Sequence, residues 1–453
     1  MTRMHVLVLG SALALVTTLS PAAALSGVMD DLLTAREALQ NGQPNAARAA
    51  LDAIDLTGLS VSEQALYYEL RGQLVRSSDP SAAAEFYARA NMLEERAYRR
   101  YEQALAHDEA GETGPALQTF ARARELDPEN VNILLSEAYA LRRAGRDGLA
   151  AERFAQARAA GAPSVNVVLD EAYARRAAGD AEGAVALFRE SVDLLGADPA
   201  SDAAQLYGIR REIQTLEDRV DGEVFLAYRS EAFNSGVGLP EQGSAFNQAG
   251  ARIAYRPEQL FRAGRGLSVY GRGFVTLEDD SLAFQEETLQ FGLGASYKPF
   301  AGQNFNLAIE RLIAGGDIAR DAWLARASYG WSEGTDWNPV AESWRYTSLY
   351  ADFAYILDEP EFTSVFASAR HGRRFAVGNR RTLTPYGVLV AQWSDDSFVK
   401  RDRFEAGLGL AYSIWFDETA YTAPAQRVDF ELEGRLASGD ADDAIIARIN
   451  WLY

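Results

Sequence analysis

The side chains best suited to proton transfer beyond residue 24 are two histidines, His107 and His371. A hydrolase built around His371 would need a nucleophile beside it, and Ser364 and Ser368 lie in the same predicted strand. Serine is also common on the wet face of a strand, where it has no catalytic role. We expect His107 at a helix surface and His371 at a strand end. The sequence therefore predicts that the chain is not an enzyme.

Other cofactor and metal chemistry finds no support in the sequence. The chain contains no cysteine, which excludes disulfides and thiolate metal sites. Residues 264–273 are rich in glycine, but they belong to a predicted strand and turn, where glycine permits twist or a close neighbour. A phosphate-binding glycine loop, a dinucleotide fingerprint and a metal-ligand cluster are all missing from the sequence. We expect no cofactor and no bound metal.

Charged residues recur with a spacing of two in several segments of the carboxyl-terminal half. The set comprises Arg252, Arg272, Glu310, Arg326, Asp352, Glu405, Asp429, Glu431, Glu433, Arg435 and Arg448. This spacing places side chains on one face of a strand. They could line a conduit for a hydrophilic polymer, together with Tyr270 and Tyr350, or pair with one another and plug the interior. Both signs of charge are present, so both alternatives stay open.

The opposite face of these segments is apolar, as where Val428, Phe430 and Leu432 alternate with acidic residues. About twelve strands are predicted, starting near Glu223, Ala249, Leu267, Leu289, Asn304, Ala322, Thr347, Phe362, Thr382, Arg403, Arg427 and Ala444. In water this apolar face would need a second sheet, as in a soluble sandwich. Strands of about 9–11 residues with aromatic ends favour an antiparallel outer-membrane β-barrel instead. The final Ile449, Trp451 and Tyr453 are typical of a barrel-assembly signal.

One connection does not fit a simple barrel. An even number of strands places both ends of a bacterial barrel in the periplasm, where turns are short. The connection from Glu333 to Arg345 lies on that side, yet it is long and rich in tryptophan. Either one strand is miscounted, or this connection is an ordered element of its own.

The amino-terminal half repeats every 34 residues. Alanine recurs at Ala82, Ala116, Ala150 and Ala184, phenylalanine at Phe86, Phe120, Phe154 and Phe188, and turn glycine at Gly111, Gly145 and Gly179. This is the period of the tetratricopeptide helix pair. We predict a tetratricopeptide α-solenoid with about four repeats in register between Glu63 and Gly196. A less regular pair, Met29 to Asp55, precedes them, and a helix from Ala203 to Arg219 follows.

Such solenoids usually present a concave binding surface, although a mere spacer would have the same pattern. Tyr139 and Tyr173, one period apart, could line that surface or pack between repeats. We regard packing as the stronger interpretation of the two tyrosines, and binding as the stronger interpretation of the solenoid.

The first 24 residues have the pattern of a secretory signal, with Arg3, an apolar stretch and the small residues Ala22 to Ala24. We therefore divide the chain into a signal peptide (1–24), a solenoid (25–219) and a barrel (222–453). The net charge of −20 argues against nucleic acid as a partner. We expect the protein in the cell outer membrane, in contact with its lipid, with the repeats in the periplasm.

An ordered series of residues in the strand half resembles the carboxyl-terminal domain of the phage-adsorption protein A (NfrA) family. The series is Tyr297-Lys298-Pro299-Phe300, Asn304 to Leu307, Glu310-Arg311, Trp323 to Arg326, Trp331, Asp336-Trp337, Trp344 and Leu349 to Tyr355. The resemblance covers roughly residues 255–415. It implies an outer-membrane protein with periplasmic tetratricopeptide repeats that takes part in exopolysaccharide export with an inner-membrane glycosyltransferase. It also implies a surface that a phage can use as a receptor, and no catalytic residues.

These observations predict an outer-membrane component of exopolysaccharide secretion. Its repeats would dock periplasmic or inner-membrane proteins of a polysaccharide synthase complex, and its barrel would anchor the assembly or conduct the polysaccharide. The alternative is an envelope scaffold, or a surface receptor exploited by phage, with a plugged barrel. An outer-membrane enzyme that uses His371 is the third and weakest hypothesis.

Overall fold

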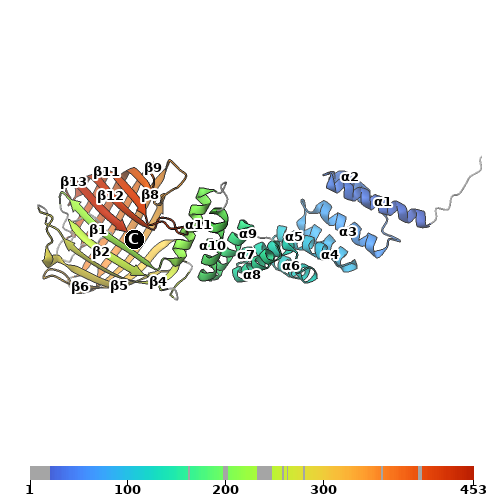
Figure 1. Ribbon diagram of the computed structural model, residues 1–453, viewed down its shortest axis with the longest axis horizontal. Helices are drawn as coiled ribbons and strands as arrows, with labels where there is room; N and C mark the ends of the chain where they lie inside the picture. Colours follow the sequence, from blue (N-terminus) through green and yellow to red (C-terminus); the bar gives the residue numbers. More distant parts are fainter. Residues whose placement is uncertain are drawn as a thin grey trace, which may run out of the picture. The chain divides into compact units, whose positions relative to one another are not determined.

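The computed structural model describes residues 21–161, 164–196, 202–231, 247–257, 260–262, 264–278, 281–358, 361–395 and 400–453 (Figure 1). The chain forms two compact units, which meet in the sequence between Val167 and Val168. Residues 1–20 of the predicted signal peptide lie outside the described residues, so that cleavage there stays a prediction.

Helices occupy the amino-terminal half. They are α1 (Pro21–Gln40), α2 (Pro44–Asp52), α3 (Val61–Val75), α4 (Pro80–Leu93), α5 (Ala97–Glu109), α6 (Thr113–Leu126), α7 (Val131–Arg143), α8 (Asp147–Ala159), α9 (Val165–Ala178), α10 (Ala181–Gly196) and α11 (Ala203–Glu217). Within the described parts of the chain, no helix has the length and apolarity needed to span a membrane.

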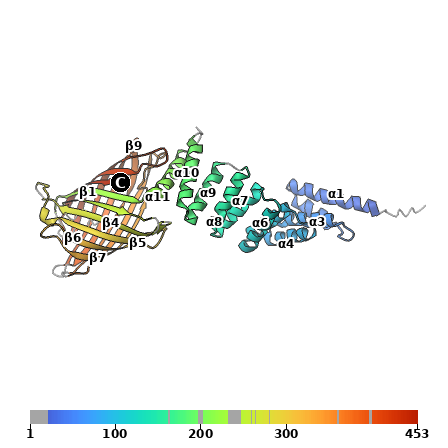
Figure 2. The same cartoon turned by 60° about the horizontal axis from the view of Figure 1, so that its bottom comes forward.

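The 34-residue period produces packed helix pairs, α3 with α4, α5 with α6 and α7 with α8, which follow one another along the chain (Figure 2). Ala116 and Phe120 of α6 are fully buried, and Phe154 of α8 takes the same place one period later. Small alanines let the two helices of a pair approach closely, while the phenylalanine ring fills the remaining gap. Gly111 and Gly145 follow the first helices with φ of 76° and 68°, a conformation that side chains with a Cβ rarely adopt. The predicted solenoid is therefore confirmed.

The predicted buried positions are wrong by one residue in the first repeat. In α4 Ala83 and Tyr87 are fully buried, whereas the predicted Ala82 and Phe86 are only partly buried. The cause is the connection before this helix. It comprises residues 76–79, whereas the corresponding connection between α5 and α6 comprises residues 110–112.

Strands make up the carboxyl-terminal half. They are β1 (Val220–Arg229), β2 (Gln248–Tyr255), β3 (Phe261–Arg262), β4 (Arg265–Thr276), β5 (Gln290–Lys298), β6 (Asn304–Ala314), β7 (Ala322–Glu333), β8 (Ser343–Ile356), β9 (Phe362–Gly378), β10 (Arg381–Asp395), β11 (Lys400–Phe416), β12 (Gln426–Gly439) and β13 (Ala444–Leu452).

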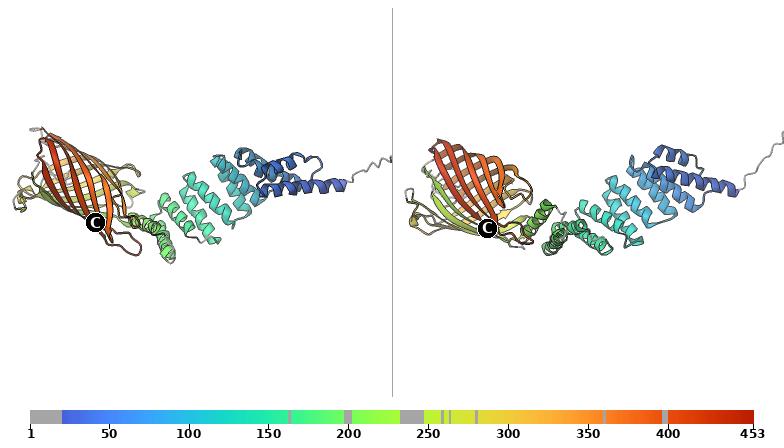
Figure 3. Two further views of the ribbon diagram at one scale, coloured as in Figure 1. Left: turned by 90° about the horizontal axis from the view of Figure 1, so that it is seen from above. Right: turned by 45° about the horizontal axis from the view of Figure 1, so that its top comes forward.

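These strands close into an antiparallel barrel, visible from two sides in Figure 3. β1 pairs with β13 on one side and with β2 on the other, and β2 pairs with β4. Among the described strands, the two-residue β3 pairs with β4 alone and is not part of the closed wall. The wall thus contains the predicted strands, with starts within a few residues of those expected. Closure leaves no free edge in the wall that the described strands other than β3 form.

The apolar face of the strands points away from the barrel interior. Leu408 of β11 and Leu436 of β12 expose 77% and 71% of their surface, while their neighbours Glu405 and Arg435 are buried. No second sheet covers this outer face anywhere in the described part of the chain. The soluble-sandwich alternative is therefore wrong, because the sheet closes on itself instead of packing on another.

The tryptophan-rich connection is an ordered element, and no strand was miscounted. β7 ends at Glu333 and β8 begins at Ser343, which leaves residues 334–342 between them. Trp344 donates its indole N–H to the carbonyl oxygen of Gly334 at 3.0 Å and so closes the base of this connection.

Candidate functional site: the barrel interior

The predicted inward residues lie on the inner face of the barrel wall, where side chains alternate with those of the apolar face. Seven of them are buried: Arg272, Glu310, Asp352, Glu405, Asp429, Glu433 and Arg435. The side chains of Arg326, Glu431 and Arg448 expose 8%, 10% and 9%, and that of Arg252 exposes 29%. Charges so far from water must be paired, because an isolated buried charge is very costly.

The largest group of paired charges joins strands from both ends of the barrel sequence. We call it the lumen network; it comprises Arg229, Arg370, Arg403, Glu405, Glu431, Glu433, Arg435 and Arg448. The carboxylate of Glu405 lies 2.7 Å from Arg435, 2.8 Å from Arg229 and 3.1 Å from Arg403. All four of these side chains expose 2% or less of their surface.

Glu433 is the second centre of the lumen network. Its carboxylate forms ion pairs with Arg435 and Arg448, lies 3.1 Å from Arg370, and accepts a hydrogen bond from the Tyr386 hydroxyl at 2.8 Å. Arginine suits this arrangement because its planar guanidinium can serve two carboxylates at once. Arg435 does so between Glu405 and Glu433.

Two smaller groups lie on the inner face of strands β4 to β8. Glu310 accepts hydrogen bonds from the Arg272 guanidinium at 2.7 Å and from the Tyr270 hydroxyl at 2.8 Å. Arg326 donates to Asp352 at 3.0 Å and lies 3.3 Å from the Tyr350 hydroxyl. The charged side chains of Arg272, Glu310, Arg326 and Asp352 are therefore also paired.

Arg252 and Asp429 stand apart from these groups. Arg252 pairs with Asp221 of β1 at 3.0 Å, and Asp429 accepts from Arg427 at 2.8 Å. The structure thus brings most of the predicted residues together, but in several separate groups.

The prediction missed three arginines of the lumen network, Arg229, Arg370 and Arg403. A signal existed for two of them: Arg370 follows Ser368 by two positions, and Arg403 precedes Glu405 by two. The same alternation that predicted the listed residues places both on the inner face. Arg229 ends β1, where a strand pattern alone cannot say how far the strand continues.

The histidine and the two serines do not form a catalytic arrangement. Along β9 the exposed Val365 and His371 alternate with the buried Ser364, so that His371 lies on the opposite face from Ser364 and Ser368. The His371 Nδ1 lies 2.9 Å from the Thr347 hydroxyl instead. The described residues contain no group of three or more potential metal ligands.

His107 is half-buried, which corrects the expectation of a helix-surface residue. Its Nδ1 lies 2.6 Å from the Glu112 carboxylate at the start of α6. Tyr139 and Tyr173 each contact the phenylalanine of their own repeat edge-on, with ring centroids 5.1 Å from Phe154 and 5.0 Å from Phe188. Both tyrosines therefore pack within a repeat, and Tyr139 still exposes 39% of its surface.

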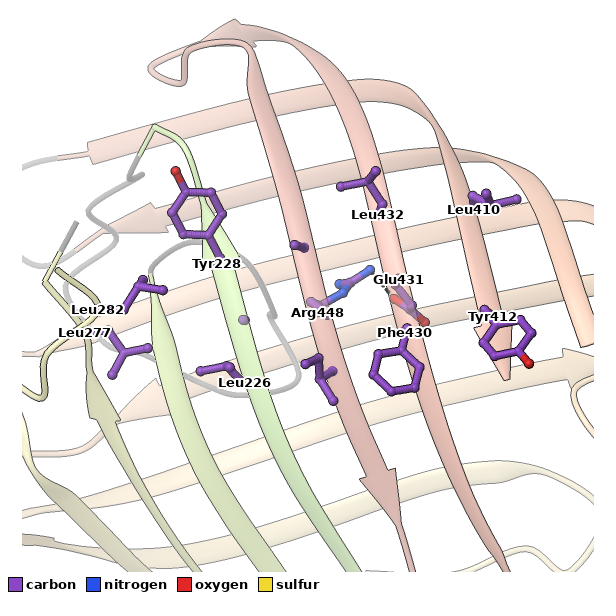
Figure 4. A pocket seen from close by; sticks show the side chains of 13 residues that line it. Leu226, Tyr228, Leu277, Leu282, Leu410, Tyr412, Phe430, Glu431, Leu432 and Arg448 are labelled. Atoms are coloured by element: carbon purple, nitrogen blue, oxygen red, sulfur yellow. Dashed lines mark ion pairs between the residues drawn. The ribbon is translucent and has the colours of Figure 1, made fainter. Parts of the chain in front are cut away.

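The outer face of the barrel is suited to hydrocarbon. Figure 4 shows one of its hollows, of about 340 Å³, lined by Leu226, Leu410 and Leu432, with the Arg448–Glu431 ion pair in the same stretch of wall. Aromatic residues such as Trp331 and Trp451 expose 44% each near strand ends. Apolar sides with aromatic ends are the pattern of outer-membrane barrels, so the fold is compatible with an outer-membrane location.

Two solved structures are similar to the helical part of the chain. A crystal structure of MamA protein is 15% identical with a TM-score of 0.34, and covers 37% of this chain and 90% of its own. The structure of YrrB, described as a TPR protein with an unusual peptide-binding site, is 16% identical with a TM-score of 0.34, and covers 39% and 92%. Because both TM-scores are low, the assignment of the helical fold depends on the helix pairs and their buried residues described above, not on these two structures.

The chain also has similarity to known proteins in sequence. Bacteriophage adsorption protein A of Escherichia coli (strain K12) is 27% identical over 209 aligned residues, and the match covers 44% of this chain but only 21% of that protein. Residues 280–449 match the family model described as Bacteriophage N adsorption protein A C-term. The barrel region of this chain is therefore similar to the carboxyl-terminal part of phage-adsorption protein A, as the residue series from Tyr297 to Tyr355 predicted.

Proposed function

We propose that this protein is an outer-membrane anchor that carries a helical binding surface on the periplasmic side and whose barrel is closed by its own ion pairs. The observation that carries the proposal is the burial of Glu405 and Glu433, which expose 0% and 1% of their surface although they face the barrel interior. A water-filled conduit would leave such carboxylates hydrated.

The topology supports the assignment of sides. The backbones of Gly222 and Tyr453 exchange hydrogen bonds of 2.9 and 3.0 Å, so that the barrel begins and ends at the same rim. In bacterial outer-membrane barrels both ends lie in the periplasm. The helices, which directly precede β1, then stand on the periplasmic side, where they can engage other proteins.

Release of a dye from liposomes that contain the reconstituted protein tests whether the barrel is closed. We expect liposomes that contain the folded full-length chain to retain a small fluorescent dye as well as protein-free liposomes do. A porin reconstituted in parallel supplies the open control. Dye release that grows with the amount of folded chain would refute the closed barrel.

Exopolysaccharide secretion is the finer function that we propose for this anchor. It is supported by the family match together with the helical repeats, which give a barrel of this type a surface for synthesis or export proteins. Deleting the gene should then abolish one surface polymer, and a copy that lacks residues 25–219 but retains the barrel should not restore it. Normal polymer export in the deletion strain would exclude this role.

Phage adsorption is the second candidate, because the curated relative is named for it. The residues exposed to a phage would be the connections on the rim opposite to the helices, such as residues 315–321 between β6 and β7. Replacing these residues should remove adsorption without affecting polymer export. Adsorption that is unchanged in the deletion strain would exclude the receptor role.

A further inference from the structure

The connection between β7 and β8, residues 334–342, crosses the end of the barrel instead of turning along its wall. We call it the strap. The carbonyl oxygen of Thr335 accepts hydrogen bonds from Arg374 of β9 and, at 3.0 Å, from Arg427 of β12. Between β8 and β12 the wall contains β9, β10 and β11. A contact that bridges this distance places the strap over the mouth of the interior.

The strap rests on a seat of inward-facing aromatic and guanidinium groups. Arg374 exposes 3% of its surface, and its guanidinium lies 5.0 Å from the ring centre of Tyr346 and 5.2 Å from that of Trp415. Trp337 of the strap packs on Trp415, with ring centroids 5.8 Å apart, and on Trp344 at 6.1 Å. Contacts between a guanidinium and an aromatic face strengthen when water is excluded.

The backbone of the strap adopts one defined shape. Gly334 has a φ of +68°, and a Cβ at this position would lie 1.9 Å from the carbonyl oxygen of Arg345. The side-chain oxygen of Asn338 accepts hydrogen bonds from the backbone N–H groups of Val340 and Ala341, at 3.1 and 3.0 Å. Such side-chain to backbone bonds stabilise a turn. The strap is therefore an ordered segment with its own internal hydrogen bonds.

Helix α11 contacts the strap from the outside. Arg211 donates to the carboxylate of Asp336 in the strap at 3.0 Å, and Arg210 donates to Glu418 at 2.8 Å in the connection between β11 and β12. The side chains of Arg211 and Asp336 are 38% and 58% exposed. Exposed pairs of this kind contribute little individually and exchange readily with water. The Arg211–Asp336 pair therefore suits a contact that can be released, whereas the Arg210–Glu418 pair, with side chains 23% and 19% exposed, is more buried.

We propose that residues 334–342 close the helix-side mouth of the barrel and that α11 acts as the latch of this closure. A displacement of α11 releases Asp336 and lets the strap leave its seat. The interior then becomes accessible only as far as the lumen network. This inference depends on the barrel of the proposed function and is independent of any polymer or phage.

Thiol labelling tests the latch, because the chain contains no cysteine of its own. The reporter is Ser413→Cys, at a fully buried inward position two residues from Trp415. We expect Arg211→Glu, which places like charges together at Asp336, to raise the rate of labelling by a hydrophilic maleimide roughly tenfold, equivalent to about 1.4 kcal/mol. The charge-swapped pair Arg211→Glu with Asp336→Arg should return the rate to that of the parent.

A second reporter separates the strap from the rest of the interior. Ser394→Cys lies at a buried inward position of β10, beyond the lumen network, and its labelling should not change with Arg211→Glu. A rise at both reporters would refute the closed barrel of the proposed function but keep the latch. Equal labelling of Ser413→Cys in all backgrounds would refute the latch itself.

A variant within the strap tests the proposal independently, in case the Arg211→Glu chain does not fold. Trp337→Ala removes the contact with Trp415 and leaves α11 unchanged. We expect it to raise labelling of Ser413→Cys like Arg211→Glu, with no rescue by a change at residue 211. If Trp337→Ala folds and leaves the labelling rate unchanged, the strap does not close the mouth.

Discussion

At the scale of single residues, the inner face of the barrel is dominated by carboxylates that are shared among several arginines. Glu405 has three guanidinium groups within 3.1 Å, and Glu433 has three as well. Because each buried carboxylate interacts with several guanidinium groups, these interactions compensate for the free energy of removing the charges from water. An exposed ion pair has no such desolvation cost to offset. The lumen network therefore depends on each carboxylate more than on any one arginine.

Replacing Glu405 with glutamine tests this dependence. Glu405→Gln leaves Arg229, Arg403 and Arg435 in a buried site without their shared negative charge, which should cost about 3–5 kcal/mol of unfolding free energy. Urea unfolding of the full-length chain in lipid vesicles, followed by tryptophan fluorescence, measures the loss. Glu333→Gln, at an exposed strand end, is the matched control and should leave the unfolding midpoint unchanged. Equal midpoints for both variants would contradict the prediction.

A second prediction at the scale of single residues concerns the stability of the helical repeats at low pH. The Arg122 and Arg100 guanidinia hydrogen-bond to Glu95 and lower the pKa of its carboxyl from 4.5 to about 2. A lowered folded-state pKa stabilises the fold above pH 4.5, and this contribution is lost as the pH falls from 4.5 to about 2.

Circular dichroism at the helix band measures this effect. Glu95→Gln should lower the melting temperature at pH 7 by no more than about 4 °C, because the ion pairs are partly exposed. The difference from the parent should shrink as the pH falls below 4.5. A difference that is the same at pH 7 and at acid pH would show that the charge of Glu95 is not its cause.

At the scale of elements, the lengths of connections decide which predicted positions become buried. One additional residue between α3 and α4 moves the buried positions from Ala82 and Phe86 to Ala83 and Tyr87. In the barrel, the connection between β9 and β10 comprises only residues 379–380, whereas the strap between β7 and β8 comprises residues 334–342. The longer connection can reach across the mouth.

Gly334→Ala tests the shape of the strap. The new methyl group would meet the Arg345 carbonyl, and its positive φ adds a backbone penalty of about 1–2 kcal/mol. We expect the strap to become accessible to protease while the barrel remains folded. Gly302→Ala, where a Cβ meets nothing within 4 Å, is the control. Equal protease sensitivity in the two variants would contradict an ordered strap.

At the scale of the whole molecule, the carboxyl terminus closes the barrel. β13 pairs with β12 on one side and with β1 on the other, and Trp451 stands opposite Val224 across this seam. The exposed Trp451 and Tyr453 lie on the outer face at the rim. A closed barrel satisfies all strand hydrogen bonds, which a membrane requires.

Removal of residues 451–453 should prevent this closure. We expect the truncated chain to be absent from the membrane as a compact barrel, because β1 and β13 lose their last paired residues and the terminal aromatic is gone. Electrophoretic mobility before and after heating distinguishes folded from unfolded barrels. Tyr453→Phe, which keeps the aromatic ring, should assemble as the parent does. Normal assembly of the truncated chain would exclude an assembly role for these residues.

Two periods in the sequence determined the architecture, because periodicity is a local property of helices and strands. The 34-residue ladder predicted the helix pairs, and the alternation of polar and apolar residues predicted which face of each strand lies inside. The same alternation was enough to separate His371 from Ser364 and Ser368, and it contained Arg370 and Arg403 of the lumen network.

Only the tertiary structure decided which charges meet and whether the interior is filled. Arg272 and Glu310 are 38 positions apart, and their pairing depends on the register of β4, β5 and β6 in the closed wall. The course of the strap likewise depends on arginines from strands that are distant in the sequence. A single strand cannot encode such partners, because they are set by the closure of the whole barrel.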